Sequence, residues 1–207
     1  MSCPQLTSAN CPPMLITLIL RLRQYTANPD PLANVAGTIA FVVACNQPFY
    51  PLYLYAIAGT EAWPSWLTLL STPFFLAVPV VARRNSLAGR AILPLAGIAN
   101  TVLSVKLIGT ASGVELFLVP CLLLGAILFR PSERAIMIPI VSLPFVAYIG
   151  LDWNLGPPLQ LYSVDEYSSI FSVHALSVAA LTVLIGLLLS SILAEHEVYK
   201  GPTSARR

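Results

Sequence analysis

The sequence predicts an all-α integral membrane protein with six transmembrane helices, both termini in the cytoplasm and a short interfacial helix near the N-terminus. Of the 207 residues, 57% are hydrophobic and only 10% are charged, whereas soluble domains carry about 25% charged residues. The apolar residues fall into runs of about 20, the length at which a helix crosses about 30 Å of hydrocarbon. All but one of the 11 Lys and Arg residues fall on the same side of these runs.

The N-terminal tail is predicted over residues 1–31. Residues 14–24, MLITLILRLRQ, are too few to cross a bilayer, so we expect an interfacial helix lying on the membrane. A cytoplasmic extension of the first span is the alternative. The stretch does not resemble a signal peptide, because Arg21 and Arg23 follow the apolar residues instead of preceding them.

The transmembrane domain is predicted over residues 32–195, and a cytoplasmic tail over 196–207. Helices are expected because an apolar run in lipid must satisfy its backbone hydrogen bonds internally. The predicted spans cover residues 35–58, 63–82, 91–109, 113–129, 132–150 and 168–193.

The charges give the orientation. Basic residues lie in the N-terminal tail, in the second and fourth connections and after the last span, and by the positive-inside rule this side is cytoplasmic. The opposite side carries the long loop 151–167. Acidic residues gather on that opposite side: Glu61, Glu115, Asp152, Asp165 and Glu166.

Lys106 is the exception among the basic residues, because it lies near the outer end of the third predicted span. Its ammonium could reach the headgroups along the membrane normal. Alternatively, it pairs with Glu115 across the Gly109–Gly113 turn, and the pair fixes the hairpin or binds a ligand carboxylate. We take the ligand-binding candidates from this side of the membrane: Lys106, Glu115, Asp152, Trp153 and His174.

His174 lies about 10 Å into the sixth predicted span, at 1.5 Å per residue from Tyr167. A histidine in a membrane helix usually forms a hydrogen bond with a neighbouring helix. Its pKa near neutrality also allows it to sense pH. Both roles are kept as expectations.

Small and polar residues form a stripe on one face of the third span, because Gly97, Asn100, Thr101 and Ser104 recur at intervals of three or four. Such stripes are typical of close helix packing in membranes, and a polar cavity is the alternative. Asn46 and Gln47 interrupt the first span just before a proline. Their amides can repair freed backbone groups or line a pocket.

Several chemistries have no support in the sequence. The four cysteines form no CxxC pair and lie near no histidine, so neither a metal site nor a cofactor is predicted. The net charge of +2 gives no general attraction for nucleic acid. Ser112 and His174 resemble the dyad of rhomboid intramembrane proteases, but Thr110-Ala111-Ser112-Gly113 departs from that family's Gly-x-Ser-Gly motif.

Residues 109–120, GTASGVELFLVP, followed by an apolar run to Arg130, resemble the six-helix membrane region of bacterial class III adenylate cyclases. Similar regions precede diguanylate cyclase and histidine kinase domains. The pattern G-x-x-S-G-x-(E/Q)-x-F-(F/L) carries most of the resemblance, which extends over about 32–195. Further support comes from Asn34, Tyr50–Tyr55 and Arg83-Arg84-Asn85.

The resemblance implies a sensory or regulatory module of the bacterial inner membrane that works among membrane lipids as a homodimer and acts on a cytoplasmic cyclase or kinase. The residues after Ala194 leave no room for cyclase carboxylates or a kinase histidine box, so we expect no enzymatic activity from this chain, whether it stands alone or is a piece of a longer protein. The alternatives are a small-solute transporter or its membrane substrate-binding subunit, and, third, an intramembrane serine protease.

Overall fold

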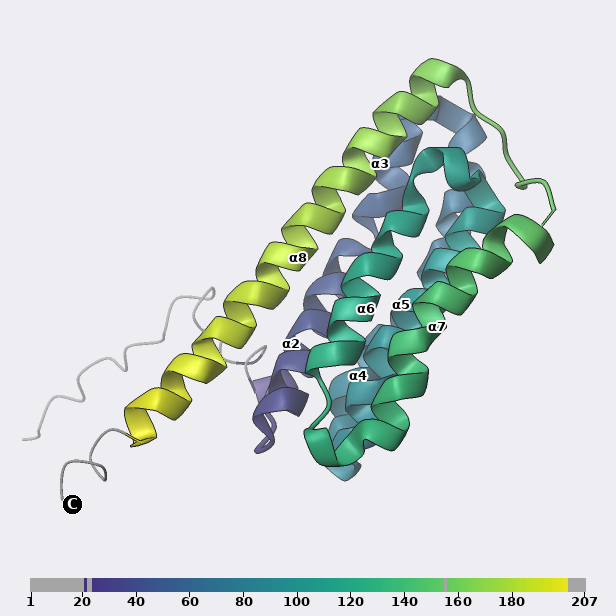
Figure 1. The fold of residues 1–207 in the computed structure, drawn as a ribbon. Coiled ribbons are helices and arrows are strands. Elements are labelled where there is room, and N and C mark those ends of the chain that lie inside the picture. Colours follow the sequence, from purple (N-terminus) through teal and green to yellow (C-terminus); the bar gives the residue numbers. More distant parts are fainter. Residues whose placement is uncertain (1–20, 22–23, 155, 201–207) are drawn as a thin grey trace, which may run out of the picture.

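The computed structural model describes residues 21, 24–154 and 156–200, and this part of the chain is helical without strands (Figure 1). The elements follow the apolar runs of the sequence. They are α2 (Pro31–Asn46), α3 (Phe49–Ala58), the 3-10 helix η1 (Gly59–Ser71), α4 (Thr72–Arg84), α5 (Ser86–Ile108), the 3-10 turns η2 (Thr110–Ser112) and η3 (Val114–Phe117), α6 (Leu118–Ile127), the 3-10 turn η4 (Pro131–Glu133), α7 (Arg134–Asn154) and α8 (Val164–Lys200).

The first apolar run forms α2 and α3, which are separated at Gln47-Pro48. Asp30 caps α2, because its carboxylate accepts a hydrogen bond from the Leu32 amide at 3.1 Å. Proline lacks an N–H and clashes with the preceding helical turn, so Pro48 explains why α2 ends at this point. The break that the sequence predicts at residues 46–48 is therefore present.

The chain then reverses, and α4 lies antiparallel to α2. Three close approaches define the pairing: the Asn28 side chain with the Ala82 carbonyl at 3.0 Å, Gly37 with Pro79, and Gln47 Nε2 with Ser71 Oγ at 2.7 Å. Residue numbers rise from Asn28 to Gln47 while those of their partners fall from Ala82 to Ser71. Residues 31–84 are thus a helical hairpin.

The second predicted span, 63–82, differs from the expectation of one continuous α-helix, since its first part lies in η1. The reason is a spacing of three between small hydroxyl residues. The hydroxyls of Ser65, Thr68 and Ser71 each donate to the carbonyl three residues earlier, at 2.6–2.8 Å. Residues three apart lie above one another in a 3-10 helix, so this spacing stabilises that form.

The α4–α5 connection is the single residue Asn85, whose side chain caps α5 by accepting from the Ala88 amide at 3.0 Å. The two helices meet closely beyond it. A Cβ atom at Gly89 would lie 2.4 Å from the Ala82 Cβ, so only glycine fits at this crossing.

Helix α8 has 37 residues, which is about 55 Å at 1.5 Å per residue. Its first half packs on α3 and on the η2–η3 turn. A Cβ at Gly113, which has a φ of 71°, would lie 2.4 Å from Phe171 Cδ2, so the turn and α8 touch there. The C-terminal end of α8 lies apart from the other helices (Figure 1).

Four segments of the described chain are long and apolar enough to cross a membrane: Pro31–Arg84, Ser86–Ile108, Pro131–Leu151 and Val164–Ser191. Val114–Ile127 is a shorter apolar helix. The first segment contains the α2–α4 hairpin. An all-helical, membrane-embedded protein is therefore supported. The predicted interfacial helix 14–24 lies outside the described residues except at Arg21 and Gln24.

Two apolar clusters form the interior. One lies among α2, α4, α5, α6, α7 and α8 and contains Ile39, Val78 and Leu128. The other lies toward the Gly109–Gly113 turn and contains Leu54, Ile108 and Ile170. We name the two ends of the bundle by their residues. The basic end holds Arg83, Arg84, Arg90, Arg130 and Arg134, and the loop end holds the Gly109–Gly113 turn and the α7–α8 connection.

Candidate functional site

Arg90 is buried at the basic end, with only 1% of its surface exposed. Its Nη1 and Nη2 atoms donate to the Glu133 carboxylate at 2.8 and 2.7 Å, and Nη1 also donates to the Leu128 carbonyl at 2.6 Å. The guanidinium lies 5.7 Å from the Phe129 ring centre. A buried charge with this many partners joins α5 to the α6–α7 turn.

Asp30 extends this cluster to α2. Its carboxylate accepts from the Ser86 hydroxyl and, at 3.2 Å, from Arg130. Burial raises the pKa of Asp30, but the hydrogen bond from Ser86 and the nearby guanidinium groups lower it more, so the pKa lies below its ordinary value. In the sequence, Arg90 and Arg130 indicate only the orientation of the chain in the membrane. The missed signal is the presence of Asp30 and Glu133 on the otherwise basic side.

At the loop end, the predicted ligand candidates do not gather around one space. Lys106 Nζ donates to the Pro157 carbonyl at 2.8 Å, in the connection that leads to α8. Glu115 lies partly buried in η3. Asp152 and Trp153 lie in the last turn of α7, and their side chains are outside the described part of the structure.

His174 lies fully buried in α8 and joins three elements. Its Nδ1 lies 2.7 Å from the Ser112 carbonyl oxygen and its Nε2 lies 3.1 Å from the Tyr50 hydroxyl. A carbonyl only accepts, so Nδ1 carries the proton and Nε2 accepts from Tyr50. The ring also stacks on Tyr50 and meets the edge of Phe117. The predicted hydrogen bond to a neighbouring helix is present.

This contact differs from a protease dyad. His174 meets the backbone of Ser112, whereas the Ser112 hydroxyl donates to the Gly109 carbonyl at 2.6 Å. A general base must reach the proton it removes. In this arrangement Ser112 and His174 stabilise the turn beneath α8.

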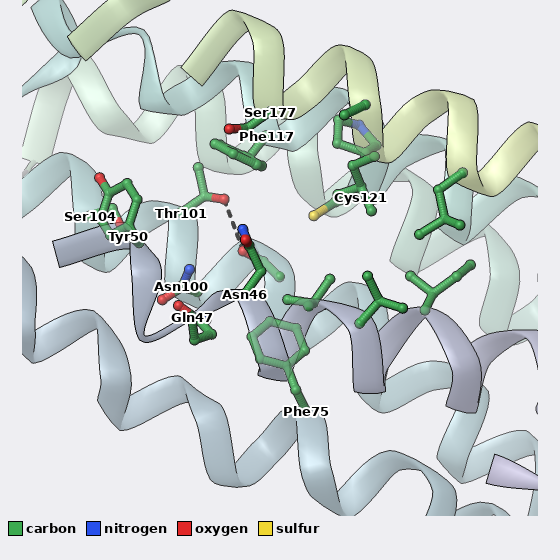
Figure 2. Close-up of a pocket in the computed structure, with 18 of the residues that line it drawn as sticks. Asn46, Gln47, Tyr50, Phe75, Asn100, Thr101, Ser104, Phe117, Cys121 and Ser177 are labelled. Atoms are coloured by element: carbon green, nitrogen blue, oxygen red, sulfur yellow. Dashed lines mark hydrogen bonds between the residues drawn. The ribbon is translucent and has the colours of Figure 1, made fainter. Parts of the chain in front are cut away.

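A cavity of about 610 Å³ lies between the two apolar clusters, with walls from α2, α3, α4, α5, η3, α6 and α8 (Figure 2). Its lining is mostly aliphatic and aromatic. Polar atoms come from the side chains of Asn46, Gln47, Tyr50, Asn100, Thr101, Ser104 and Ser177. Among the described residues, no Asp, Glu, Lys, Arg or His lines it.

The polar stripe lines this cavity in full, because Gly97, Asn100, Thr101, Ser104, Asn46 and Gln47 all belong to its wall. The stripe also permits close packing. A Cβ at Gly97 would lie 2.6 Å from Cys121 Sγ, and Thr101 Oγ1 donates to the Gly97 carbonyl at 2.9 Å (Figure 2). The two interpretations of the stripe are therefore compatible. The side-chain oxygen of Asn100 is buried without a hydrogen-bond partner.

Lys106, Glu115 and His174 do not line the cavity, although Tyr50 and Phe117, which hold the His174 ring, do. Tyr50 and Ser177 were missed as cavity residues. A signal existed for Ser177, which lies one helical turn after His174 and on the same face.

The groups in the cavity wall can hold a ligand. Within the described residues, no group of three His, Cys, Asp or Glu side chains could hold a metal ion. The cavity wall offers amides, hydroxyls and apolar surface, which can orient a ligand by hydrogen bonds and apolar contact. No family model, no curated protein and no solved structure matches this chain.

Proposed function

We propose that this chain is a sensory or regulatory module of the bacterial inner membrane, without catalytic activity of its own. Occupancy of the cavity would bias the packing of α8, and α8 would carry the change to a cytoplasmic partner. We further propose six membrane passes with both termini in the cytoplasm. The hairpin in residues 31–84 and the gathering of Arg83, Arg90 and Arg130 at one end of the bundle support this topology.

The observation that carries the proposal is the double role of α8. Leu176, Ser177, Ala180, Leu181 and Leu184 form one wall of the cavity. The same helix continues to Lys200, and its length of about 55 Å exceeds the roughly 30 Å of hydrocarbon. One rigid element therefore contacts the cavity and extends beyond the bundle at the basic end.

The packing of α8 is uneven along its length. The loop end is held by Phe171 against Gly113, by His174 against Ser112 and by the Tyr167 hydroxyl, which donates to the Ile108 carbonyl at 3.1 Å. Farther along, Ile185 is fully buried in the first apolar cluster, and only the C-terminal end of α8 lies apart from the other helices (Figure 1). A helix that is held at the loop end and along its middle, and whose C-terminal end is free of the bundle, suits a change of tilt at that end. A ligand shifts such an equilibrium only by its difference in affinity between the two states.

The test uses a side chain in place of a ligand. Ser177→Phe places a ring in the cavity, and Ser172→Phe makes the same change on an exposed face of α8 away from the cavity. Spin labels at S132C and S191C, in a background without native cysteines, report the distance from the η4 turn to α8. We expect Ser177→Phe to shift the distance distribution and Ser172→Phe to leave it unchanged. Equal distributions in both variants would contradict the proposal.

The partner is tested separately. Co-expression with cytoplasmic cyclases and kinases, followed by co-purification in detergent, should recover one of them with the full chain. We expect Ser177→Phe to alter the activity of the recovered enzyme. Failure to recover any such enzyme would count against a cyclase or kinase as the partner.

A small-solute transporter, or its substrate-binding subunit, is the second candidate, and the polar wall of the cavity favours it. Asn46, Asn100 and Ser104 could hydrogen-bond a solute inside the bundle. Uptake by vesicles reconstituted with the purified chain separates the two functions, because a sensor would show none.

A further inference from the structure

We infer that the cavity binds an uncharged, single-chain amphiphile from the surrounding bilayer, with a hydrogen-bond donor at its polar end. A long-chain alcohol is the simplest molecule of this class. The inference rests on the proposed function in one respect: it takes the cavity as the site to which α8 responds.

The absence of charge in the wall is the first argument. The described lining residues include no Asp, Glu, Lys, Arg or His. A charged headgroup in a membrane interior is costly unless an opposite charge or several polar groups compensate it. The cavity therefore selects against carboxylate, phosphate and ammonium headgroups. Lys106 and Glu115, which could hold such groups, lie elsewhere.

The second argument is the state of Asn100. Its side-chain oxygen is buried and has no hydrogen-bond partner. An amide oxygen accepts hydrogen bonds only, and an unpartnered buried acceptor is costly. Asn100 lines the cavity, and a small rotation of its side chain would bring this oxygen to a ligand hydroxyl. Thr101 and Ser177 add further acceptors, because their hydroxyls already donate to the Gly97 and Val173 carbonyls. A pure hydrocarbon would leave the oxygen unpartnered.

The third argument is the position of the opening. The exposed residues of the lining belong to α2, α3 and α8: Val42 is 41% exposed, Phe49 52%, Tyr53 50% and Leu176 73%. The opening therefore lies at the side of the bundle, between α8 and the α2–α3 pair. In a membrane this face meets acyl chains, so a ligand dissolved in the bilayer reaches the cavity directly.

The size of the cavity sets the length of the ligand. At roughly 30 Å³ per non-hydrogen atom, taken from the share of a water molecule in the liquid, about 610 Å³ holds about 20 atoms. This matches a single acyl-length chain with a small polar end. A two-chain phospholipid is too large to enter whole.

The experiment uses the full chain in phosphatidylcholine nanodiscs and four photoactivatable probes. Each probe is a 16-carbon chain with a mid-chain diazirine. The chains end in a hydroxyl, a methyl, a trimethylammonium or a sulfonate group, and labelled peptides are mapped by mass spectrometry. We expect the hydroxyl probe to label residues inside the cavity, such as Thr101, Ser104 and Ser177, and unlabelled hexadecanol to compete. The charged probes should label only residues outside the cavity.

Three variants sharpen the test. Asn100→Leu keeps the size of the side chain and removes its polar atoms, so the preference for the hydroxyl over the methyl probe should fall about fivefold, the value of one hydrogen bond. Ser177→Phe should abolish cavity labelling, whereas Ser172→Phe should retain it. The comparison of the four probes on the unchanged protein tests the ligand class even where a variant fails to fold.

Different results would contradict the ligand class and the proposed function. Charged probes that label the cavity as well as the hydroxyl probe, or a hydroxyl probe with no advantage over the methyl probe, would overturn the ligand class. The S132C–S191C distance is then measured with hexadecanol. Specific labelling of the cavity without a change in this distance would support the ligand class and contradict the proposed sensory role.

Discussion

The two terminal nitrogens of Arg90 donate to both oxygens of Glu133, at 2.8 and 2.7 Å, and so join α5 to the turn before α7. The arginine side chain is 2% exposed and the glutamate side chain 17% exposed. A parallel, two-bond pair of this kind is geometrically specific. It holds the basic end of the bundle together through residues 43 positions apart.

Arg90→Met should destabilise the protein strongly, because it leaves the Glu133 carboxylate without its main partner. Loss of one member of a buried ion pair costs about 3–5 kcal/mol, and the partial exposure of Glu133 places the expected loss toward the lower value. Thermal unfolding in detergent, followed by tryptophan fluorescence, measures it. Arg84→Met, at an exposed arginine near the same end, is the matched control. The double variant Arg90→Met/Glu133→Gln should recover part of the loss, and no recovery would count against the pair.

Asp30 should make stability depend on pH in the acidic range. Its pKa in the folded protein lies below the ordinary value of 3.8, so folding favours the ionised form. The stabilisation is fully present above the pKa of the unfolded chain and is lost as the pH falls through the folded pKa. Unfolding followed from pH 5 downward should show a steeper loss in the unchanged protein than in Asp30→Asn. Parallel pH profiles would contradict the assignment.

Gly113→Ala should loosen α8. Gly113 has a φ of 71°, and a Cβ there would lie 2.4 Å from Phe171 Cδ2. The strained backbone alone costs about 1–3 kcal/mol. The control is Gly186→Ala, where a Cβ meets nothing within 4 Å and the helical position favours alanine by up to about 1 kcal/mol. Protease sensitivity of α8 measures both changes, and equal sensitivity would show that the turn does not hold the helix.

Ser112 is not expected to act as a protease nucleophile, so Ser112→Ala should not change the reaction of the protein with a serine-reactive probe. The Ser112 hydroxyl bonds the Gly109 carbonyl, and His174 bonds the Ser112 backbone, so no activated nucleophile is assembled. A fluorophosphonate probe should not label the purified protein. Labelling that disappears in Ser112→Ala would revive the protease alternative.

The cavity shows where sequence reasoning reaches its limit. The spacing of Gly97, Asn100, Thr101 and Ser104 identifies one helix face, because the period of a helix is known. The spacing does not indicate which other helices lie opposite this face. The structure places α2, α6 and α8 there and leaves space between them. Tyr50 and Ser177 join the same wall from segments 50 and 77 residues away, and no local pattern relates them to Asn100.

The basic residues also show what the sequence determines and what packing determines. All but one of the basic residues lie in positions that the sequence assigns to one side of the membrane. Their roles there differ for reasons of packing. Arg84 is exposed, whereas Arg90 is buried against Glu133, Leu128 and Phe129. Arg90 lies one turn into α5 and reaches the α6–α7 turn, and only that contact separates a buried structural arginine from a surface one.

By itself, the sequence determined that the chain is helical and built for a membrane, because long apolar runs leave the backbone no other way to satisfy its hydrogen bonds. It also determined the break at Gln47-Pro48 and the polar face of α5, since both follow from local chemistry. Only the tertiary structure decided that this face borders a cavity without charged residues, that His174 secures α8 to Tyr50 and Ser112, and that Arg90 is buried. These depend on contacts between distant segments, and such contacts are fixed by how whole helices pack.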